Sequence, residues 1–428
     1  MQLVLYKDVP YKRLFSDMSW ILEHYEDVFY NKEDLMALYY ECVNQLIEIA
    51  GEYGLEGNLW HTYLAFIIAN DENAFSTACE IVGQVSGSIN FFAKNDFQIL
   101  KKLFDFDLEK IDSHFQISIS KELKSYVNVN KNSKVFNKRI RDRICELAES
   151  LEKAKNIDEF YLSVTTFYKE FGVGKFGLHK AFRIAHNTND EVIISPITCT
   201  EHAKLDDLVG YELQKQKLID NTKNFVEGRP ANNCLLFGDS GTGKSSSIKA
   251  ILNEYYDSGL RMIEVYKHQF KDLSAVIAQI KDRNYKFIIY MDDLSFEEFE
   301  IEYKYLKAVI EGGLERKPDN VLIYATSNRR HLIKESFDDT KDYNIELHAS
   351  DTVQEKLSLV ARFGVTIYFG APDKRQFQGI VRQLAKKAGI IMDEEKLFQE
   401  ANKWELSHGG LSGRCAQQFI TYLKGKQE

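Results

Sequence analysis

A glycine-rich segment near the middle of the chain constrains the fold more than any other feature of the sequence. Gly238, Gly243, Lys244 and Ser245 match the pattern G-x-x-x-x-G-K-S. The apolar run NCLLF at 233–237 comes directly before it and an amphipathic stretch follows, which predicts a strand, a tight loop and a helix. Glycines let a loop turn its N–H groups around an anion, and the helix N-terminus adds the positive end of its dipole. An ordinary glycine turn is the alternative, but the strand and helix beside the loop favour phosphate binding.

The residue types in this loop predict that it binds ATP together with Mg²⁺. Lys244 can reach the β- and γ-phosphates, and the Ser245 hydroxyl can ligate the metal ion. The residues expected to contact the nucleotide here are Gly238, Asp239, Ser240, Gly241, Thr242, Gly243, Lys244, Ser245 and Ser246.

Two adjacent aspartates follow the apolar run FIIYM at 287–291. We expect Asp292 to hold Mg²⁺ with Ser245, and Asp293 to orient and polarise the attacking water. Asp reaches about one C–C bond less far than the Glu that often serves there, and a misplacement of ~1 Å can cost ~10²-fold in rate. Slow hydrolysis is therefore compatible with Asp293, and Glu297 could substitute for it through a water. The alternative is a buried strand that ends in a solvated acidic turn.

Three further polar residues are candidates for the same site. Asn328 follows the apolar run NVLIYAT and can touch the γ-phosphate or the lytic water; a loop amide that caps a helix is the alternative. Arg362 precedes the run VTIYF, where it can reach a neighbouring subunit's site and neutralise charge in the transition state, or form a surface ion pair instead. Arg414 stands in HGGLSGRC, whose glycines would let a helix close near the phosphates.

The periodicity of apolar residues predicts an α/β protein with a mostly helical N-terminal domain. Five short apolar runs alternate with helical segments after residue 200, which indicates a parallel sheet covered on both faces. No strand is expected beyond Pro372, where the pattern is helical. The expected domains are a helical region at 1–195, a connector at 196–204, an α/β core at 205–371 and a helical lid at 372–428.

Composition limits the classes of partner. A formal charge of -9 argues against a sequence-independent grip on nucleic acid through the whole surface. The apolar windows are too short to span a bilayer, no secretory segment is evident at the start, and the six cysteines show no metal spacing. We therefore expect a cytoplasmic protein with reduced thiols and no membrane partner.

These motifs, in this order, resemble those of an AAA+ ATPase. The segment LDDLVGYE at 205–212 is similar to the one that this family places beside the adenine, which implies adenine contacts for Val209 and Gly210. The resemblance covers roughly 205–425. The runs PANNCLLFGDSGTGKSSSIKA, MDDLSFE, LKAVIEGGLERKPDNVLIYATSNRRHL and EKLSLVARFG most resemble one bacterial P-loop family, domain of unknown function eight-one-five.

The resemblance implies a five-stranded parallel sheet in the order 5-1-4-3-2, a C-terminal helical lid and assembly into a ring or part-ring. It further implies that Asn328 is the first sensor, Arg362 the finger that acts in the neighbouring subunit, and Arg414 the second sensor. Arg330 is the second choice for the finger.

Three functions are compatible with these features. The leading hypothesis is Mg²⁺-dependent ATP hydrolysis that drives conformational work on a protein client or DNA-associated partner recognised by the helical N-terminal domain. The second is an ATP-dependent switch or loader with negligible hydrolysis until oligomerisation or a partner completes the site. The third is a scaffold with a vestigial site. The client, the process and the oligomer number stay open.

Overall fold

The computed structural model describes residues 2–7, 9–128, 138–198, 200, 203–296, 302–311, 318–328 and 359–427. The chain divides into two compact units, Met1–His179 and Lys180–Glu428. Throughout the described ranges, no helix combines the length and the apolar character needed to cross a membrane.

The first unit is built from helices around one apolar core. Its centre is α3, whose residues from Leu59 to Ala69 are all buried; a helix that is apolar on every side is stable only inside a core. Asn58 caps its first turn by accepting the backbone N–H of His61, and α2, α5 and α8 pack around it. The helices are α1 (Lys12–His24), α2 (Lys32–Tyr53), α3 (Leu59–Asn70), α4 (Ala74–Val82), α5 (Ile89–Phe104), α6 (Glu109–Phe115), α7 (Ser120–Lys124), α8 (Lys138–Lys153), α9 (Ile157–Phe171) and α10 (Gly174–Leu178).

A buried carboxylate fixes the N-terminal segment of this unit. Asp96 of α5 is fully buried and accepts the backbone N–H groups of Val4 at 2.9 Å, Leu5 at 2.7 Å and Tyr6 at 3.2 Å. Three main-chain donors satisfy the charge where water cannot reach it.

The second unit contains a seven-stranded sheet in the order β2-β1-β4-β5-β6-β3-β7. The five strands expected from the sequence are β3, β4, β5, β6 and β7, which pair in parallel and keep the expected relative order. The expected count of five was wrong, because β1 pairs with β4 in parallel and β2 pairs with β1 antiparallel. The strands are β1 (Ala181–His186), β2 (Val192–Pro196), β3 (Cys234–Gly238), β4 (Leu260–Glu264), β5 (Lys286–Met291), β6 (Val321–Ser327) and β7 (Val365–Phe369).

The two additional strands form a hairpin at the edge of the sheet. In β1 the buried residues Phe182 and Ile184 alternate with the more exposed Arg183 and Ala185, which is the period of a half-buried strand. Such alternation over six residues is a weaker signal than the apolar runs of β3 and β5. It lies in the region that the sequence analysis expected to be helical.

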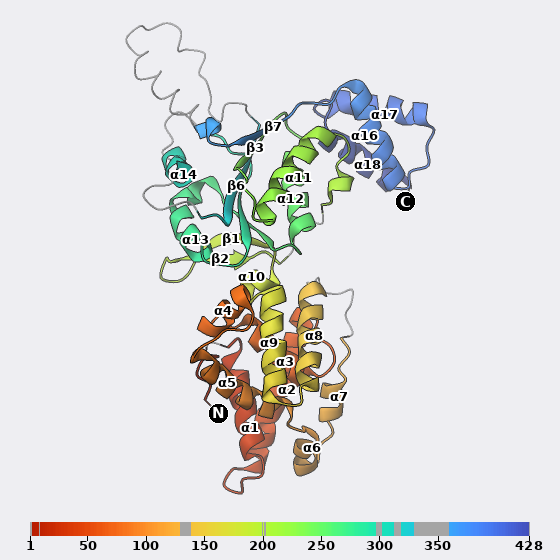
Figure 1. The fold of residues 1–428 in the computed structure, drawn as a ribbon. Helices are drawn as coiled ribbons and strands as arrows, with labels where there is room; N and C mark the ends of the chain where they lie inside the picture. Colours follow the sequence, from red (N-terminus) through yellow and green to blue (C-terminus); the bar gives the residue numbers. More distant parts are fainter. Residues whose placement is uncertain are drawn as a thin grey trace. The chain divides into compact units, whose positions relative to one another are not determined.

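Helices cover both faces of the sheet (Figure 1). On one face α11 and α12 pack against the side chains of β3, β4, β5 and β6, whereas α13 and α14 lie on the opposite face. Three helices form the lid around their own apolar core, which includes Phe377, Leu397 and Phe419. The elements are η1 (Leu205–Asp207), α11 (Glu212–Val226), α12 (Lys244–Tyr255), η2 (Lys267–Asp272), α13 (Leu273–Ile280), α14 (Glu302–Glu311), α16 (Lys374–Lys387), α17 (Glu394–Ser407) and α18 (Gly413–Gln427).

Replacing Asp96 should destabilise the first unit. Asp96→Ala leaves three main-chain donors without their acceptor, and hydrogen bonds to charged groups contribute about 1.5–3 kcal/mol each, so we expect a loss of at least about 2 kcal/mol. Chemical denaturation followed by Trp fluorescence would measure it. Asp158→Asn is the matched control, because Asp158 pairs with Lys94 at the surface and its replacement should cost less than about 1 kcal/mol. Equal losses in the two variants would contradict this role for Asp96.

Candidate functional site

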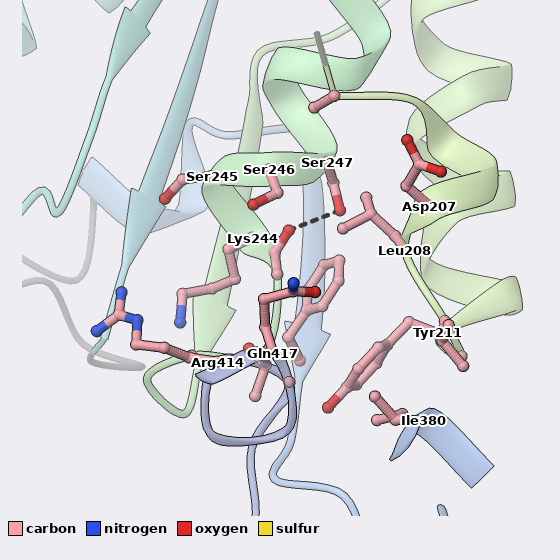
Figure 2. Close-up of a pocket in the computed structure, with 18 of the residues that line it drawn as sticks. Asp207, Leu208, Tyr211, Lys244, Ser245, Ser246, Ser247, Ile380, Arg414 and Gln417 are labelled. Carbon is pink, nitrogen blue, oxygen red and sulfur yellow. Dashed lines mark hydrogen bonds between the residues drawn. The ribbon is translucent and has the colours of Figure 1, made fainter. Parts of the chain in front are cut away.

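A cavity of about 1150 Å³ opens between the carboxyl edge of the sheet, the segment before α11, and the lid. Figure 2 shows its walls: the loop into α12, Leu208 and Tyr211 from the segment before α11, and Ile380, Arg414 and Gln417 from the lid. It brings together most of the residues singled out in the sequence. Those in its lining are Val209, Gly210, Ser240, Gly241, Thr242, Gly243, Lys244, Ser245, Ser246, Asp292, Asp293, Asn328 and Arg414.

The glycine-rich loop has a backbone that only glycine adopts easily. Gly238, Gly241 and Gly243 have φ angles of 131°, 74° and 93°, all in the region that side chains disfavour. A Cβ atom on Gly238 would lie 2.1 Å from the carbonyl oxygen of Phe369, so main chain packs directly on main chain. At Gly241 a Cβ would approach Ser412 and Arg414 of the lid at 3.1 Å. Two of these glycines thus allow close approach as well as the turn.

Lys244 lies at the bottom of this loop and is 6% exposed. Its Nζ donates to the carbonyl oxygens of Gly238 at 2.9 Å and Asp239 at 2.7 Å, and to Asn328 Oδ1 at 3.0 Å. Burial lowers the pKa of Lys244 and the nearby Arg414 adds to this effect, whereas Asp239, Asp293 and Asp292 oppose it. A negative charge placed beside this buried ammonium would stabilise its charged form.

Ser245 and Asp292 meet across the cavity. Ser245 Oγ donates to Asp292 Oδ1 at 2.7 Å, and Thr326 Oγ1 donates to the same oxygen at 2.6 Å. Burial alone would raise the pKa of Asp292, but hydrogen bonds from Thr326, Ser245 and Tyr290 outweigh it, so the pKa is lowered. The carboxylate is therefore charged and oriented.

Asp293 and Asn328 form a carboxylate–amide pair in the site. Asn328 Nδ2 donates to Asp293 Oδ1 at 2.8 Å, while its Oδ1 accepts from Lys244. Asp293 has a φ of 50°, and its N–H donates to Thr326 Oγ1 at 2.9 Å. Thr326 therefore bonds to both aspartates. The sequence analysis did not select it, although it stands in the same TSN run as Asn328.

The far end of the cavity is apolar. Leu208, Val209, Ile380 and Leu384 line it, together with the ring of Tyr211. Tyr211 packs on Phe369 with ring centroids 5.2 Å apart, and burial, with Asp239 nearby, raises its pKa to about 12. This apolar slot between main chain and lid fits a flat heteroaromatic ring, while Gln417 adds a polar edge.

Five predicted residues are not part of this lining. Gly238 and Asp239 stand at the start of the loop but are not among the residues that line the cavity. Arg362 is half-buried in the turn just before β7 and does not line the cavity. Glu297 and Arg330 lie outside the described residues.

The groups present fit a nucleotide with a divalent ion. Backbone N–H groups and the Lys244 ammonium at one end suit phosphates, and the Ser245 hydroxyl and Asp292 carboxylate supply hard oxygen ligands. Among the described residues, no group of three or more His, Cys, Asp or Glu side chains could cage a metal. Mg²⁺ binds proteins through one or two carboxylates together with substrate phosphates, and Asp292 could supply one such carboxylate.

The sequence matches the model of one protein family, described as Protein of unknown function (DUF815), over residues 178–427. The chain belongs to this family. The match spans the sheet, the loop and the lid, and their arrangement is that of the P-loop AAA+ fold.

Solved structures and curated proteins complete the comparison. One similar structure is the Thermotoga maritima RuvB Holliday junction branch migration motor, at 14% identity and a TM-score of 0.37; the match covers 52% of this chain and 64% of that chain. Another is the FIGL-1 AAA domain in complex with ADP, at 16% identity and a TM-score of 0.37, covering 53% of this chain and 74% of that chain. This DUF815 member thus spans slightly less than two thirds of the RuvB chain. No curated protein matches the sequence.

Thr326→Val should raise the pKa of Asp292, because it removes a donor to the carboxylate. A carboxyl group whose folded pKa is lowered stabilises the fold above its unfolded pKa of about 3.9, and that contribution disappears as pH falls through the folded pKa. The difference in unfolding free energy between Thr326→Val and the native chain should therefore shrink from pH 7 to pH 3.

Carbon-13 NMR of the carboxyl groups, with Asp292 assigned from an Asp292→Asn spectrum, would measure the pKa. Thr326→Ser keeps the hydroxyl and should titrate like the native chain. An unchanged Asp292 titration in Thr326→Val would refute the assignment.

Proposed function

We propose that this protein binds ATP with Mg²⁺ in the cavity and hydrolyses the γ-phosphate bond, using the change in nucleotide state for conformational work on a partner. One observation carries the proposal. Lys244, Asn328 and Asp293 form one hydrogen-bonded chain, and Ser245, Asp292 and Thr326 form another, both at the loop after β3. Three strand ends thus converge on a phosphate-binding loop with every residue type that phosphoryl transfer uses.

Each of these residues has a proposed role. Lys244 exchanges its carbonyl partners for the β- and γ-phosphate oxygens, and the Ser245 hydroxyl and Asp292 hold Mg²⁺. When bound, the ion offsets the negative charge of the phosphate oxygens. Asp293 orients the attacking water and accepts its proton, with Asn328 fixing the carboxylate.

The apolar end of the cavity takes the adenine, between Val209, Gly210 and the ring of Tyr211 on one side and Ile380 on the other. The Arg414 side chain extends from the lid beside that of Lys244 (Figure 2). The Arg414 backbone N–H already donates to the Gly241 carbonyl at 3.1 Å, which fixes the start of α18 beside the loop. A nucleotide would thus be enclosed by sheet and lid.

Assembly and partner recognition complete the proposal. Arg362 lies outside the cavity of its own chain, so we propose that it acts on the site of a neighbouring copy in a ring or part-ring. The helical first unit would recognise the client, either a protein or a DNA-associated partner. A cytoplasmic location stays a prediction.

A switch with negligible hydrolysis is the second candidate function. Asp293 is shorter than the Glu often found in its role and is occupied by Asn328, which favours a site that stays inactive until a partner rearranges it. The two functions differ in turnover, not in ATP binding.

Lys244→Ala should weaken Mg²⁺–ATP binding at least about tenfold, because a charge-assisted bond to phosphate contributes about 1.5–3 kcal/mol. Phosphate release should fall to background. Isothermal calorimetry and a phosphate assay would measure the two effects. Lys223→Ala, an exposed position on α11 away from the cavity, is the control. A native chain with no calorimetric heat and no rise in melting temperature would overturn the proposed function.

Turnover per chain should rise with protein concentration if a neighbour supplies Arg362. We expect Arg362→Ala to lower turnover at saturating ATP by at least about 10³-fold while Mg²⁺–ATP affinity changes less than about threefold, because the side chain acts on transition-state charge. Arg382→Ala, at an exposed ion pair of the lid, is the control. Turnover that stays near zero at every protein concentration, with and without DNA, would favour the switch.

A further inference from the structure

The connection between the sheet and the lid is held by one residue of the phosphate-binding loop. The β7–α16 connector runs from Phe369, the last residue of β7, through residues 370–373 to the start of α16. The Asp239 N–H donates to the carbonyl oxygen of Phe369 at 2.9 Å, and the Ala371 N–H donates to Asp239 Oδ2 at 2.6 Å. Asp239 therefore bonds to the connector on both sides of Gly370, once through its backbone and once through its side chain.

Two further contacts fix the same stretch. Tyr211 Oη donates to the carbonyl oxygen of Gly370 at 2.8 Å, from the apolar end of the cavity. The Gly238 α-carbon leaves no space for a Cβ before the Phe369 carbonyl. Three consecutive connector positions, 369 to 371, are thus each attached to a residue of the loop or of the cavity wall.

Asp239 is also hydrogen-bonded to Lys244. Its carbonyl oxygen accepts from Lys244 Nζ at 2.7 Å and from Thr242 Oγ1 at 2.8 Å. A phosphate group at the loop competes with the Asp239 carbonyl oxygen for the Lys244 ammonium. Phosphate binding therefore changes the hydrogen bond between Lys244 and the Asp239 peptide. Because Asp239 is bonded to the connector at two places, that change is passed to residues 369–371.

A second point of the lid, the start of α18, is attached to the same loop. Arg414, at the start of α18, donates its backbone N–H to the carbonyl oxygen of Gly241. The three helices α16, α17 and α18 share one apolar core, so the lid responds as a body. The loop therefore holds the lid at two points, before α16 and at the start of α18.

An acidic side chain at position 239 needs an explanation. A carboxylate beside a polyanion site repels the ligand, and the pattern G-x-x-x-x-G-K-S allows any residue there. The hydrogen bond from the Ala371 N–H gives the carboxylate a structural role at this position.

We infer that Asp239 is a positioning residue: its carboxylate, through the Ala371 N–H, sets the orientation of the lid over the bound nucleotide. This inference rests on the proposed function and deepens it. It adds a path from the loop to the lid that runs through the connector and is separate from the Arg414 side chain.

The test breaks the bond from each side. Asp239→Ala removes the acceptor, whereas Ala371→Pro removes the donor and leaves the loop untouched; the residue before Pro372 already favours an extended backbone that proline tolerates. Each variant should raise the Kd for Mg²⁺–ATP, measured by calorimetry, about fivefold, because a lid that is closed less often lowers apparent affinity. The double variant should also lose about fivefold, since both changes remove one interaction. Asp239→Asn keeps an acceptor and should stay within about threefold of the native chain.

Hydrogen exchange gives a second readout that does not depend on Ala371→Pro folding correctly. A peptide spanning residues 368–376 should exchange at least about tenfold faster in Asp239→Ala than in the native chain or Asp239→Asn. Bound Mg²⁺–ATP should protect lid peptides in the native chain and in Asp239→Asn, and much less in Asp239→Ala.

The outcomes separate the two proposals. If the native chain binds Mg²⁺–ATP but the single losses multiply to about 25-fold in the double variant, the carboxylate and the amide act independently and the inference is wrong. Native exchange and native lid protection in Asp239→Ala would also overturn it, with the proposed function intact. If the native chain itself binds no Mg²⁺–ATP, the proposed function fails first.

Discussion

The site depends on the close approach of two strand ends. Gly238 and Phe369 are partners in the β3–β7 register, and the missing side chain of Gly238 lets the Phe369 carbonyl lie where a Cβ would be. The loop after β3 therefore starts in contact with the end of β7. Because β3 also pairs with β6, Thr326 and Asn328 flank the loop on its other side. Sheet order thus places the carboxylates on one side of the loop and the route to the lid on the other.

Charge in the cavity is arranged around Lys244. Burial lowers the pKa of this lysine, and three aspartates partly offset the effect. The arrangement leaves the ammonium satisfied by two carbonyl oxygens and an amide, none of which carries a charge. A phosphate is a stronger partner than any of these three. The proposed nucleotide would therefore form a charge-assisted hydrogen bond with Lys244. The carbonyl oxygens of Gly238 and Asp239 would then lose the Lys244 ammonium as a donor, which would link nucleotide binding to a rearrangement of the loop backbone.

The site residues that could be predicted are those that belong to short sequence patterns. The loop glycines, Lys244 and Asp292 follow from short patterns beside apolar runs, and the resemblance supplied the relative order of five strands. The hairpin of β1 and β2 was missed because β1 alternates buried with exposed residues and the apolar run of β2 is confined to Val192–Ile194. Thr326 was missed because its partners Asp292 and Asp293 lie on another strand. The bond between Asp239 and Ala371 joins residues 132 positions apart, so no periodicity can reveal it.

The backbone at Asp293 bears on whether an aspartate can do the work of a glutamate. A φ of 50° is costly for a residue with a side chain, by about 1–3 kcal/mol, and persists only where surrounding contacts enforce it. Two such contacts are present: the Asp293 N–H bonds to Thr326, and the carboxylate bonds to Asn328. The left-handed turn changes the direction in which Cβ leaves the strand, so side-chain length alone does not fix the position of the carboxylate. A shorter acid on a left-handed turn is therefore a different arrangement from a longer acid on a relaxed strand end.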